Sequence, residues 1–218
     1  MSNETLITLD DPGSLAAEAY RTLRTNIEFS GVDEQLQTLL VTSPVPVDDK
    51  SATVANLAVA MADGDRPVIL VDADLRRPMQ HTIFNLANDR GFTDLFRDDE
   101  AFNNPPLQPI PNTSLQVLTS GALPPIPSQL LASKKMEAVI KQLTGMADIV
   151  IFDAPPLITV NDAALVASVM DGVLMVVRAG STKRDYVKAA KDQLEKVNAR
   201  LVGAVLTNAH VDTSLQYR

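Results

Sequence analysis

Six short apolar runs that alternate with longer segments of helical period most constrain how this chain can fold. The runs are rich in β-branched residues and apolar throughout, as strands buried on both faces are. They cover residues 37–43, 67–73, 115–120, 148–155, 172–179 and 201–208. Segments of helical period lie near 14–29, 51–62, 128–144, 161–169 and 182–197. This order predicts a single α/β domain over residues 1–218, with a mostly parallel sheet and helices on both faces.

Two proline-rich stretches interrupt the alternation. Residues 98–114, DDEAFNNPPLQPIPNTS, carry no clear period, and we expect an irregular surface loop there. Residues 120–128, SGALPPIPS, predict a second turn.

Composition excludes several classes of function. The chain has 19 basic and 27 acidic residues, a net charge of −8, which disfavours nonspecific binding to nucleic acid or to an anionic membrane. It contains no cysteine and only two histidines, so a disulfide framework or a zinc site is not expected. The first residues, MSNETLITLDD, are acidic and polar, unlike a secretion signal, and no apolar run approaches the roughly 20 residues that span a bilayer. We therefore expect a cytoplasmic protein.

The stretch TSPVPVDDKSAT, residues 42–53, has the place and the ending of a phosphate-binding loop. It follows an apolar run, and Lys50 and Ser51 open a helix-like segment. In such loops the lysine binds phosphate, and the hydroxyl binds Mg²⁺. Residues 44–50, called the phosphate loop below, are thus a candidate nucleotide site. Taken alone, Lys50 and Ser51 could simply start a helix.

Three aspartates end predicted strands. Asp72 and Asp74 lie in VILVDADLRRP, and Asp153 ends DIVIFD, which looks like a Walker B strand. Each alone is more often a helix cap or a turn residue. Because the carboxyl ends of parallel strands meet at one edge of the sheet, we expect the three to lie near Lys50. Ser51, Asp72 and Asp153 are then the candidate Mg²⁺ ligands if MgATP binds.

Several motifs together resemble one family, the cytoplasmic kinase domains of bacterial tyrosine kinases that serve capsular and exopolysaccharide export. EAYRTLRTNI matches the family's oligomerisation helix at Glu18, Arg21 and Arg24. The other matching segments are VTSP with KSATVANLAVAMA (Walker A), VILVDADLRRPMQHTIFNL (Walker A′), LTSGALPPIPSQLLAS and DIVIFDAPP (Walker B). The resemblance covers nearly the whole chain.

This resemblance implies a P-loop kinase that uses ATP and Mg²⁺, with Asp72, Asp74 and Asp153 as its catalytic carboxylates. It also implies homo-oligomers built through residues 1–30. A membrane adaptor, a polysaccharide co-polymerase, would hold the domain at the inner face of the membrane through its cytoplasmic tail. Arg76 and Arg77 would lie near the pocket for the acceptor tyrosine.

The C-terminal tail, residues 209–218, departs from the family pattern. The family's tyrosine cluster is reduced here to Tyr217, a possible phosphosite whose alternative is a terminus without a role. Thr207 and Asn208 stand where family members often carry an adenine contact, which leaves the base contact open.

The phosphate loop departs most from the family. Val47 and Asp49 replace two glycines, and Asp48 adds a second carboxylate. A non-glycine residue in left-handed conformation costs roughly 1–2 kcal/mol. A carboxylate roughly 5 Å from a phosphate charge adds about 3 kcal/mol at an effective dielectric of about 20. These terms predict a degenerate loop with impaired or lost ATP binding.

Two alternatives concern this loop. Asp48 and Asp49 could point outward, so that Lys50 still reaches phosphate. An aspartate of the loop or of a Walker motif could instead pair with Lys50 and hold the site shut.

Three functions follow from these alternatives. The favoured one is a pseudokinase without a firmly bound cofactor, which acts as a regulatory or oligomerising subunit. Its expected partner is a membrane adaptor, and an active kinase paralogue is a further candidate partner. The second is an active ATP–Mg²⁺ protein-tyrosine autokinase. The third, a partition-type ATPase that associates with DNA, is least favoured because of the charge and the kinase-like proline-rich segment.

Overall fold

The computed structural model describes residues 6–30, 36–47 and 49–209, and one seven-stranded sheet organises them. The strand order is β3-β4-β2-β5-β1-β6-β7, and all neighbours are parallel except β3 and β4. The strands are β1 Thr38–Thr42, β2 Val68–Asp72, β3 Gln108–Pro109, β4 Leu115–Leu118, β5 Ile149–Asp153, β6 Gly172–Arg178 and β7 Leu201–Thr207. The predicted mostly parallel α/β fold is confirmed.

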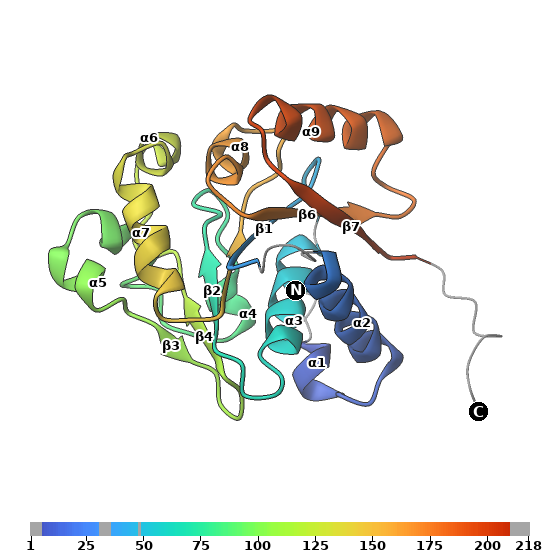
Figure 1. Cartoon of the computed structure of the whole chain (residues 1–218), viewed down its shortest axis with the longest axis horizontal. Helices are drawn as coiled ribbons and strands as arrows, with labels where there is room; N and C mark the ends of the chain where they lie inside the picture. The colour runs from blue at the N-terminus through green and yellow to red at the C-terminus, as the bar shows by residue number, and fades with distance from the viewer. Residues whose placement is uncertain (1–5, 31–35, 48, 210–218) are drawn as a thin grey trace.

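Helices cover both faces of this sheet (Figure 1). They are α1 Ile7–Asp10, α2 Leu15–Ser30, α3 Lys50–Met61, α4 Gln80–Ile83, η1 Phe92–Phe96, α5 Asp99–Asn103, α6 Pro127–Leu131, α7 Lys135–Thr144, α8 Asp162–Ala167 and α9 Arg184–Lys196, where η1 is a 3₁₀ helix.

Two apolar cores, one on each face, account for the continuously apolar strands. Successive strand residues point to opposite faces, so Leu39 and Val41 of β1 join the core under α3, whereas Leu40 joins the core under α7, α8 and α9. Figure 1 shows α1, α2 and α3 grouped on one side and α8 and α9 on the other. Burial on both faces therefore fixes the strands and places their ends.

The carboxyl ends of β2, β5 and β1 lie side by side at one edge. Asp72 of β2 is in register with Asp153 of β5, and Asp153 is also level with Val41 of β1. The loop that leaves β1 and the acidic ends of β2 and β5 are thus brought together by strand pairing alone.

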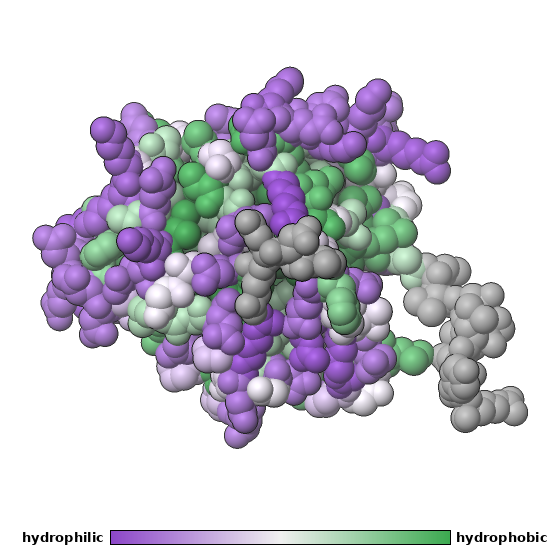
Figure 2. All heavy atoms as spheres, in the orientation of Figure 1, coloured by the Kyte–Doolittle hydropathy of each residue, from purple (hydrophilic) through white to green (hydrophobic). Residues whose placement is uncertain are grey.

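Three local expectations were wrong. The segment 128–144 is two helices, α6 and α7, rather than one. Residues 98–114 are only partly irregular, because they hold α5 and the short strand β3, which pairs antiparallel with β4. Strand β7 is not buried on both faces, since it forms the sheet edge and Leu206 is 56% exposed. Figure 2 shows the apolar surface near β7 beside the hydrophilic side chains of α9.

Within the described ranges, the structure contains no helix that is both long enough and apolar enough to cross a membrane.

Candidate nucleotide site

The phosphate loop connects β1 to α3, and neither Val47 nor Asp49 has the left-handed backbone that favours glycine. Asp49 precedes α3 with φ −95° and ψ 3°, and Val47 is not among the described residues with positive φ. The carbonyl of Asp49 accepts hydrogen bonds from the backbone N–H and the hydroxyl of Thr53, at 2.9 and 2.7 Å. The predicted strain is therefore absent at these two positions, because neither residue adopts the left-handed conformation. Asp48 lies outside the described residues.

Lys50 is buried and engaged by carboxylates. Its side chain is 5% exposed, and Nζ donates to Oδ1 of Asp153 and lies 3.5 Å from Oδ2 of Asp74. The hydroxyl of Ser51 is 3.4 Å from Nζ. Burial disfavours the ammonium charge, but Asp153 and Asp74 outweigh that effect, so the pKa of Lys50 is raised. The hypothesis of an internal ion pair is confirmed, with Asp153 as the partner.

The carboxylate of Asp72 lies beside this pair, and only one of its two oxygens has hydrogen-bond partners among the described residues. Its Oδ2 accepts from the backbone N–H groups of Met79 and Gln80, at 3.0 and 2.9 Å. Its Oδ1 is buried and has no hydrogen-bond partner among the described residues. Burial and the nearby carboxylate of Asp153 raise the pKa of Asp72 well above its usual value.

Gln80, which the sequence analysis missed, bridges the site. It is fully buried, and its Nε2 donates to Oδ2 of Asp153 at 2.8 Å and to the carbonyl of Ser51 at 3.1 Å. Its Oε1 is buried and without a partner in the part of the chain that the structure describes. The only sequence signal was its place in MQHTIF, just after the second acidic motif.

Arg178 is a second missed residue, and it pairs with the phosphate loop. Nη1 of Arg178 lies 2.8 Å from Oδ2 of Asp49. Arg178 ends β6, the strand next to β1, which explains how a residue distant in sequence reaches the loop. The carboxylate of Asp49 therefore has a counter-ion, and its predicted repulsion of phosphate is partly offset.

Asp74 anchors the turn after β2. Its Oδ1 accepts from the backbone N–H groups of Arg76 and Arg77, at 3.4 and 3.1 Å, and burial raises its pKa, although Lys50 opposes the shift. The guanidinium of Arg76 forms two hydrogen bonds with the buried carboxylate of Asp162, at 2.7 and 3.2 Å. Arg76 therefore links the turn after β2 to Asp162, the first residue of α8.

These residues fit a Mg²⁺ ion bound together with a nucleotide better than a metal held by the protein alone. Among residues 6–30, 36–47 and 49–209, no group of three or more His, Cys, Asp or Glu side chains could hold a metal ion. Mg²⁺ usually takes one or two carboxylates and fills its other positions with water and substrate phosphates. The unpaired oxygen of Asp72 and the hydroxyl of Ser51 suit such a site.

The three charges of the predicted oligomerisation helix make contacts within the chain. Nη1 of Arg21 lies 2.5 Å from Oε2 of Glu18, and its Nη2 donates to the carbonyl of Pro12. Arg24 donates to the carbonyl of Ala60 at 2.9 Å, which ties α2 to the last turn of α3. Glu18 stays 64% exposed.

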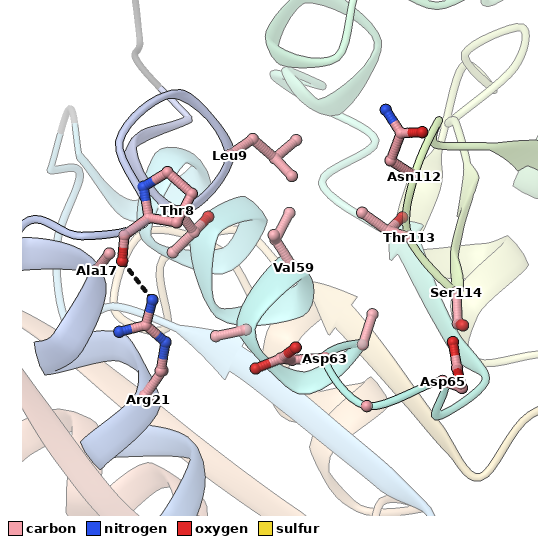
Figure 3. Close-up of a pocket in the computed structure, with 14 residues that line it drawn as sticks. Thr8, Leu9, Ala17, Arg21, Val59, Asp63, Asp65, Asn112, Thr113 and Ser114 are labelled. Carbon is pink, nitrogen blue, oxygen red and sulfur yellow. Dashed lines mark hydrogen bonds between the residues drawn. The ribbon is translucent and has the colours of Figure 1, made fainter.

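Arg21 also lines a cavity of about 300 Å³ (Figure 3). The cavity lies between α1, α2, the end of α3 and residues 112–114 of the turn before β4. Lys50 begins α3, so the cavity and the nucleotide site lie at opposite ends of that helix. Tyr217 lies outside the described residues.

A parallel sheet with Lys50 and Ser51 after its first strand and aspartates at the ends of β2 and β5 defines a P-loop NTPase-type domain. No family model matches the chain. The chain is 39% identical over 212 residues to the tyrosine-protein kinase YwqD of Bacillus subtilis. The matched region covers 97% of this chain and 89% of that protein. The chain is 32% identical over 195 residues to the tyrosine-protein kinase CpsD of Streptococcus agalactiae, 88% of this chain and 83% of that protein. The chain therefore belongs to the bacterial tyrosine-protein kinase family.

Solved structures agree with this assignment. The chimerical protein CapA2B2 superposes with a TM-score of 0.85 at 36% identity, covering 94% of this chain and 89% of that one. The kinase domain of the Escherichia coli tyrosine kinase ETK gives a TM-score of 0.85 at 29% identity, covering 98% and 85%. A plasmid partition protein from Borrelia burgdorferi, 14% identical with a TM-score of 0.58, shares the fold alone.

Proposed function

We propose that this chain is a pseudokinase of capsular or exopolysaccharide biosynthesis, a regulatory and oligomerising subunit that binds nucleotide weakly. One observation carries the proposal. The phosphate loop has Val47 and Asp49 at the glycine positions, and the lysine that should bind phosphate is held by Asp153 and Asp74.

Nucleotide binding would have to overcome both features. Lys50 would exchange its buried carboxylate partners for phosphate, and the phosphate would have to approach a loop that carries the side chains of Val47 and Asp49. Arg178 offsets one loop carboxylate, so the remaining loss is smaller than two full repulsion terms. A loss of about 3 kcal/mol corresponds to a more than hundredfold weaker affinity.

The proposed partners are a second copy of the chain, through Glu18, Arg21 and Arg24, and the cytoplasmic tail of a membrane adaptor at the inner face of the membrane. An active kinase paralogue is a third. In an active kinase, a ligand shifts the population of arrangements only by preferring one of them. Here the Lys50–Asp153 pair would fix one arrangement without a ligand.

An active autokinase is the second candidate, and two observations favour it. Asp49 already has a counter-ion in Arg178, and Oδ1 of Asp72 is free to accept a hydrogen bond from a metal-bound water. Bound Mg²⁺ would neutralise developing phosphate charge. Lys50 would bind phosphate, Asp72 and Asp153 would orient the metal, and Asp74 would accept the proton of a tyrosine hydroxyl.

Calorimetric titration with MgATP and MgADP separates the two candidates. The pseudokinase predicts no micromolar binding, and it predicts that Val47→Gly with Asp49→Gly restores affinity about a hundredfold. Adding Lys50→Met to that pair should abolish the gain. Asp65→Gly, in a turn at φ 61° that lines the cavity, is the matched control and should change nothing. Micromolar binding by the unmodified chain, with transfer to a tyrosine peptide, would overturn the pseudokinase.

A further inference from the structure

We propose that the cavity at the last turn of α3, called the α3-end cavity below, binds a neutral sugar, either a monosaccharide or one unit of a glycan. The inference goes beyond the proposed function, because this cavity lies at the opposite end of α3 from Lys50.

The size and the lining of the α3-end cavity suit a small molecule. Its volume of about 300 Å³ lies at the lower end of the range for ligand pockets and corresponds to the space of about ten waters. Figure 3 shows Leu9 and Val59 on one side of the cavity and Asn112, Thr113 and Ser114 on the other. The cavity therefore has one apolar wall and one polar wall.

Three side chains of the lining have hydrogen-bonding groups available. The carboxylate of Asp65, the amide of Asn112 and the hydroxyl of Ser114 make no hydrogen bond within the part of the chain that the structure describes. The carboxylate accepts hydrogen bonds, whereas the amide and the hydroxyl both donate and accept. A sugar hydroxyl also donates and accepts, so it can pair with each of the three. The C–H groups of the sugar ring can pack against Leu9 and Val59.

The pairing of two adjacent strands brings the polar groups together. Asp65 precedes β2, whereas Asn112 and Ser114 precede β4. Val68 of β2 is in register with Leu115 of β4, and the backbone N–H of Val68 donates to the carbonyl of Ser114 at 3.2 Å. The amino ends of β2 and β4 therefore hold the polar wall, at the edge of the sheet opposite the nucleotide site.

Hydrogen bonds within the chain also fix the surrounding segments. The backbone N–H and the hydroxyl of Thr8 donate to Oδ1 of Asn56, at 3.0 and 2.9 Å, which attaches α1 to α3. The hydroxyl of Thr113 donates to the carbonyl of Ile110 at 2.9 Å and accepts from the backbone N–H of Leu115 at 3.1 Å. A lining that is held in place before binding loses little entropy when a ligand enters.

The charges of the lining favour a neutral ligand. Arg21 pairs with Glu18, and Asp63 lies 3.6 Å from Arg24, so each of these charges has a counter-ion. Asp65 carries the one lining charge without a salt bridge among the described residues. Its carboxylate disfavours an anionic ligand such as a sugar phosphate. Because Asp65 is exposed, water screens this charge, and it attracts a cation only weakly.

Nuclear magnetic resonance of the backbone amides tests the proposal on the unmodified chain, with glucose, galactose and mannose as the titrants. At least one of the three should shift the amides of Gly64, Asp65 and Asn112 and spare those of Met79 and Gln80. We expect a dissociation constant of about 10 mM or tighter. No saturable shift below about 100 mM with any of the three, or shifts only elsewhere, would overturn the proposal.

Charged derivatives of the hexose that binds identify the class of ligand. Its 6-phosphate should bind at least about threefold more weakly, because it brings an anion near Asp65. Binding of the 2-amino derivative without binding of any neutral hexose would make the cavity a cation site, and the proposal would be wrong.

Two variants test the contacts. Asn112→Gly removes the amide and tolerates the φ of 61°, so it should weaken sugar binding about 3- to 10-fold. Asp65→Asn keeps an acceptor and removes the charge, so it should change the affinity for a neutral sugar by less than about threefold. Asn198→Gly, at an exposed position with φ 55° after α9, is the matched control and should have no effect. An unchanged affinity in Asn112→Gly would show that the sugar does not contact the polar wall.

Calorimetry with MgATP reports the nucleotide site separately. The residues that line the α3-end cavity do not include Lys50 or its carboxylate partners. Tight ATP binding would therefore overturn the pseudokinase and leave this inference standing, whereas a failure of sugar binding would leave the pseudokinase unaffected.

Discussion

The carboxylate of Asp49 lies 2.8 Å from the guanidinium of Arg178, so this side chain of the phosphate loop has its counter-ion at the end of the neighbouring strand. Both side chains are about one-third exposed or less, at 26% and 34%. Removing Asp49 would therefore do two things. It would take a negative charge from the phosphate loop and release an arginine that can bind phosphate.

A double-mutant comparison tests this release. In a chain with Val47→Gly and Asp49→Gly, Arg178→Met should lower MgADP affinity about tenfold, the loss of one charge-assisted contact. In a chain with Val47→Gly alone, Arg178 remains paired with Asp49. There, Arg178→Met should lower the MgADP affinity by less than it does in the double variant. Calorimetry in both backgrounds measures the difference. An equal effect of Arg178→Met in the two would show that the arginine never reaches phosphate.

The buried Lys50–Asp153 pair makes a prediction about stability. Lys50→Met leaves buried carboxylates without their ammonium, and removing one partner of a buried pair costs about 3–5 kcal/mol. Urea denaturation followed by circular dichroism at neutral pH measures the loss. Lys191→Met is the matched control, because Lys191 pairs with Glu195 at 3.4 Å with both side chains more than half exposed. That change should cost less than about 0.5 kcal/mol.

Asp72 gives a prediction about pH. Burial and then Asp153 raise its pKa in the folded chain, so the folded state holds this proton more tightly than the unfolded state does. The associated stability is fully present below the unfolded pKa of about 4 and is lost as the pH rises through the folded pKa. Asp72→Asn removes that dependence. Its free energy of unfolding should exceed that of the unmodified chain by an amount that grows as the pH rises from acid toward neutral.

Denaturation of the two chains at several pH values provides the check. Titrating groups distant from Asp72 affect both chains alike, so the difference between the curves reports Asp72 together with the neighbours that interact with it, Asp153, Lys50 and Asp74. A difference that stays flat, or that shrinks toward neutral pH, would contradict the raised pKa.

Strand pairing explains why much of the site could be predicted from the sequence. Asp72 and Asp153 end adjacent parallel strands in register, and Lys50 follows a third strand that neighbours β5. An apolar run and the residue that ends it are local features of the sequence. Because the carboxyl ends of parallel strands share one edge of the sheet, these local features predict that Lys50, Asp72 and Asp153 lie close together.

Side-chain partners between distant segments could not be predicted in this way. Arg178 was one basic residue at the end of an apolar run, and nothing in that run indicates Asp49 as its partner. Gln80 begins the short helix α4, and its two contacts depend on the depth at which that helix packs. The partial exposure of β7 depends on its place at the sheet edge, which its apolar sequence does not reveal.

Arg24 and Glu18 of the predicted oligomerisation helix α2 differ in burial and in their contacts within the chain, so mutation can separate their effects. Arg24 is held by the carbonyl of Ala60 at 2.9 Å and lies 3.6 Å from Asp63, so Arg24→Ala should destabilise the chain by about 1–2 kcal/mol. The side chain of Glu18 is 64% exposed, and it pairs with Arg21 of the same helix. Glu18→Ala should leave the free energy of unfolding unchanged within about 0.5 kcal/mol.

If α2 forms the proposed subunit contact, Glu18→Ala should nevertheless lower the mass measured by sedimentation velocity. Glu195→Ala, an equally exposed glutamate on α9, is the control and should change neither quantity. An assembly that survives Glu18→Ala and dissociates only with Arg24→Ala would mean that the helix supports the fold rather than the contact. A chain that sediments as a monomer at all concentrations would remove the proposed homo-oligomer altogether.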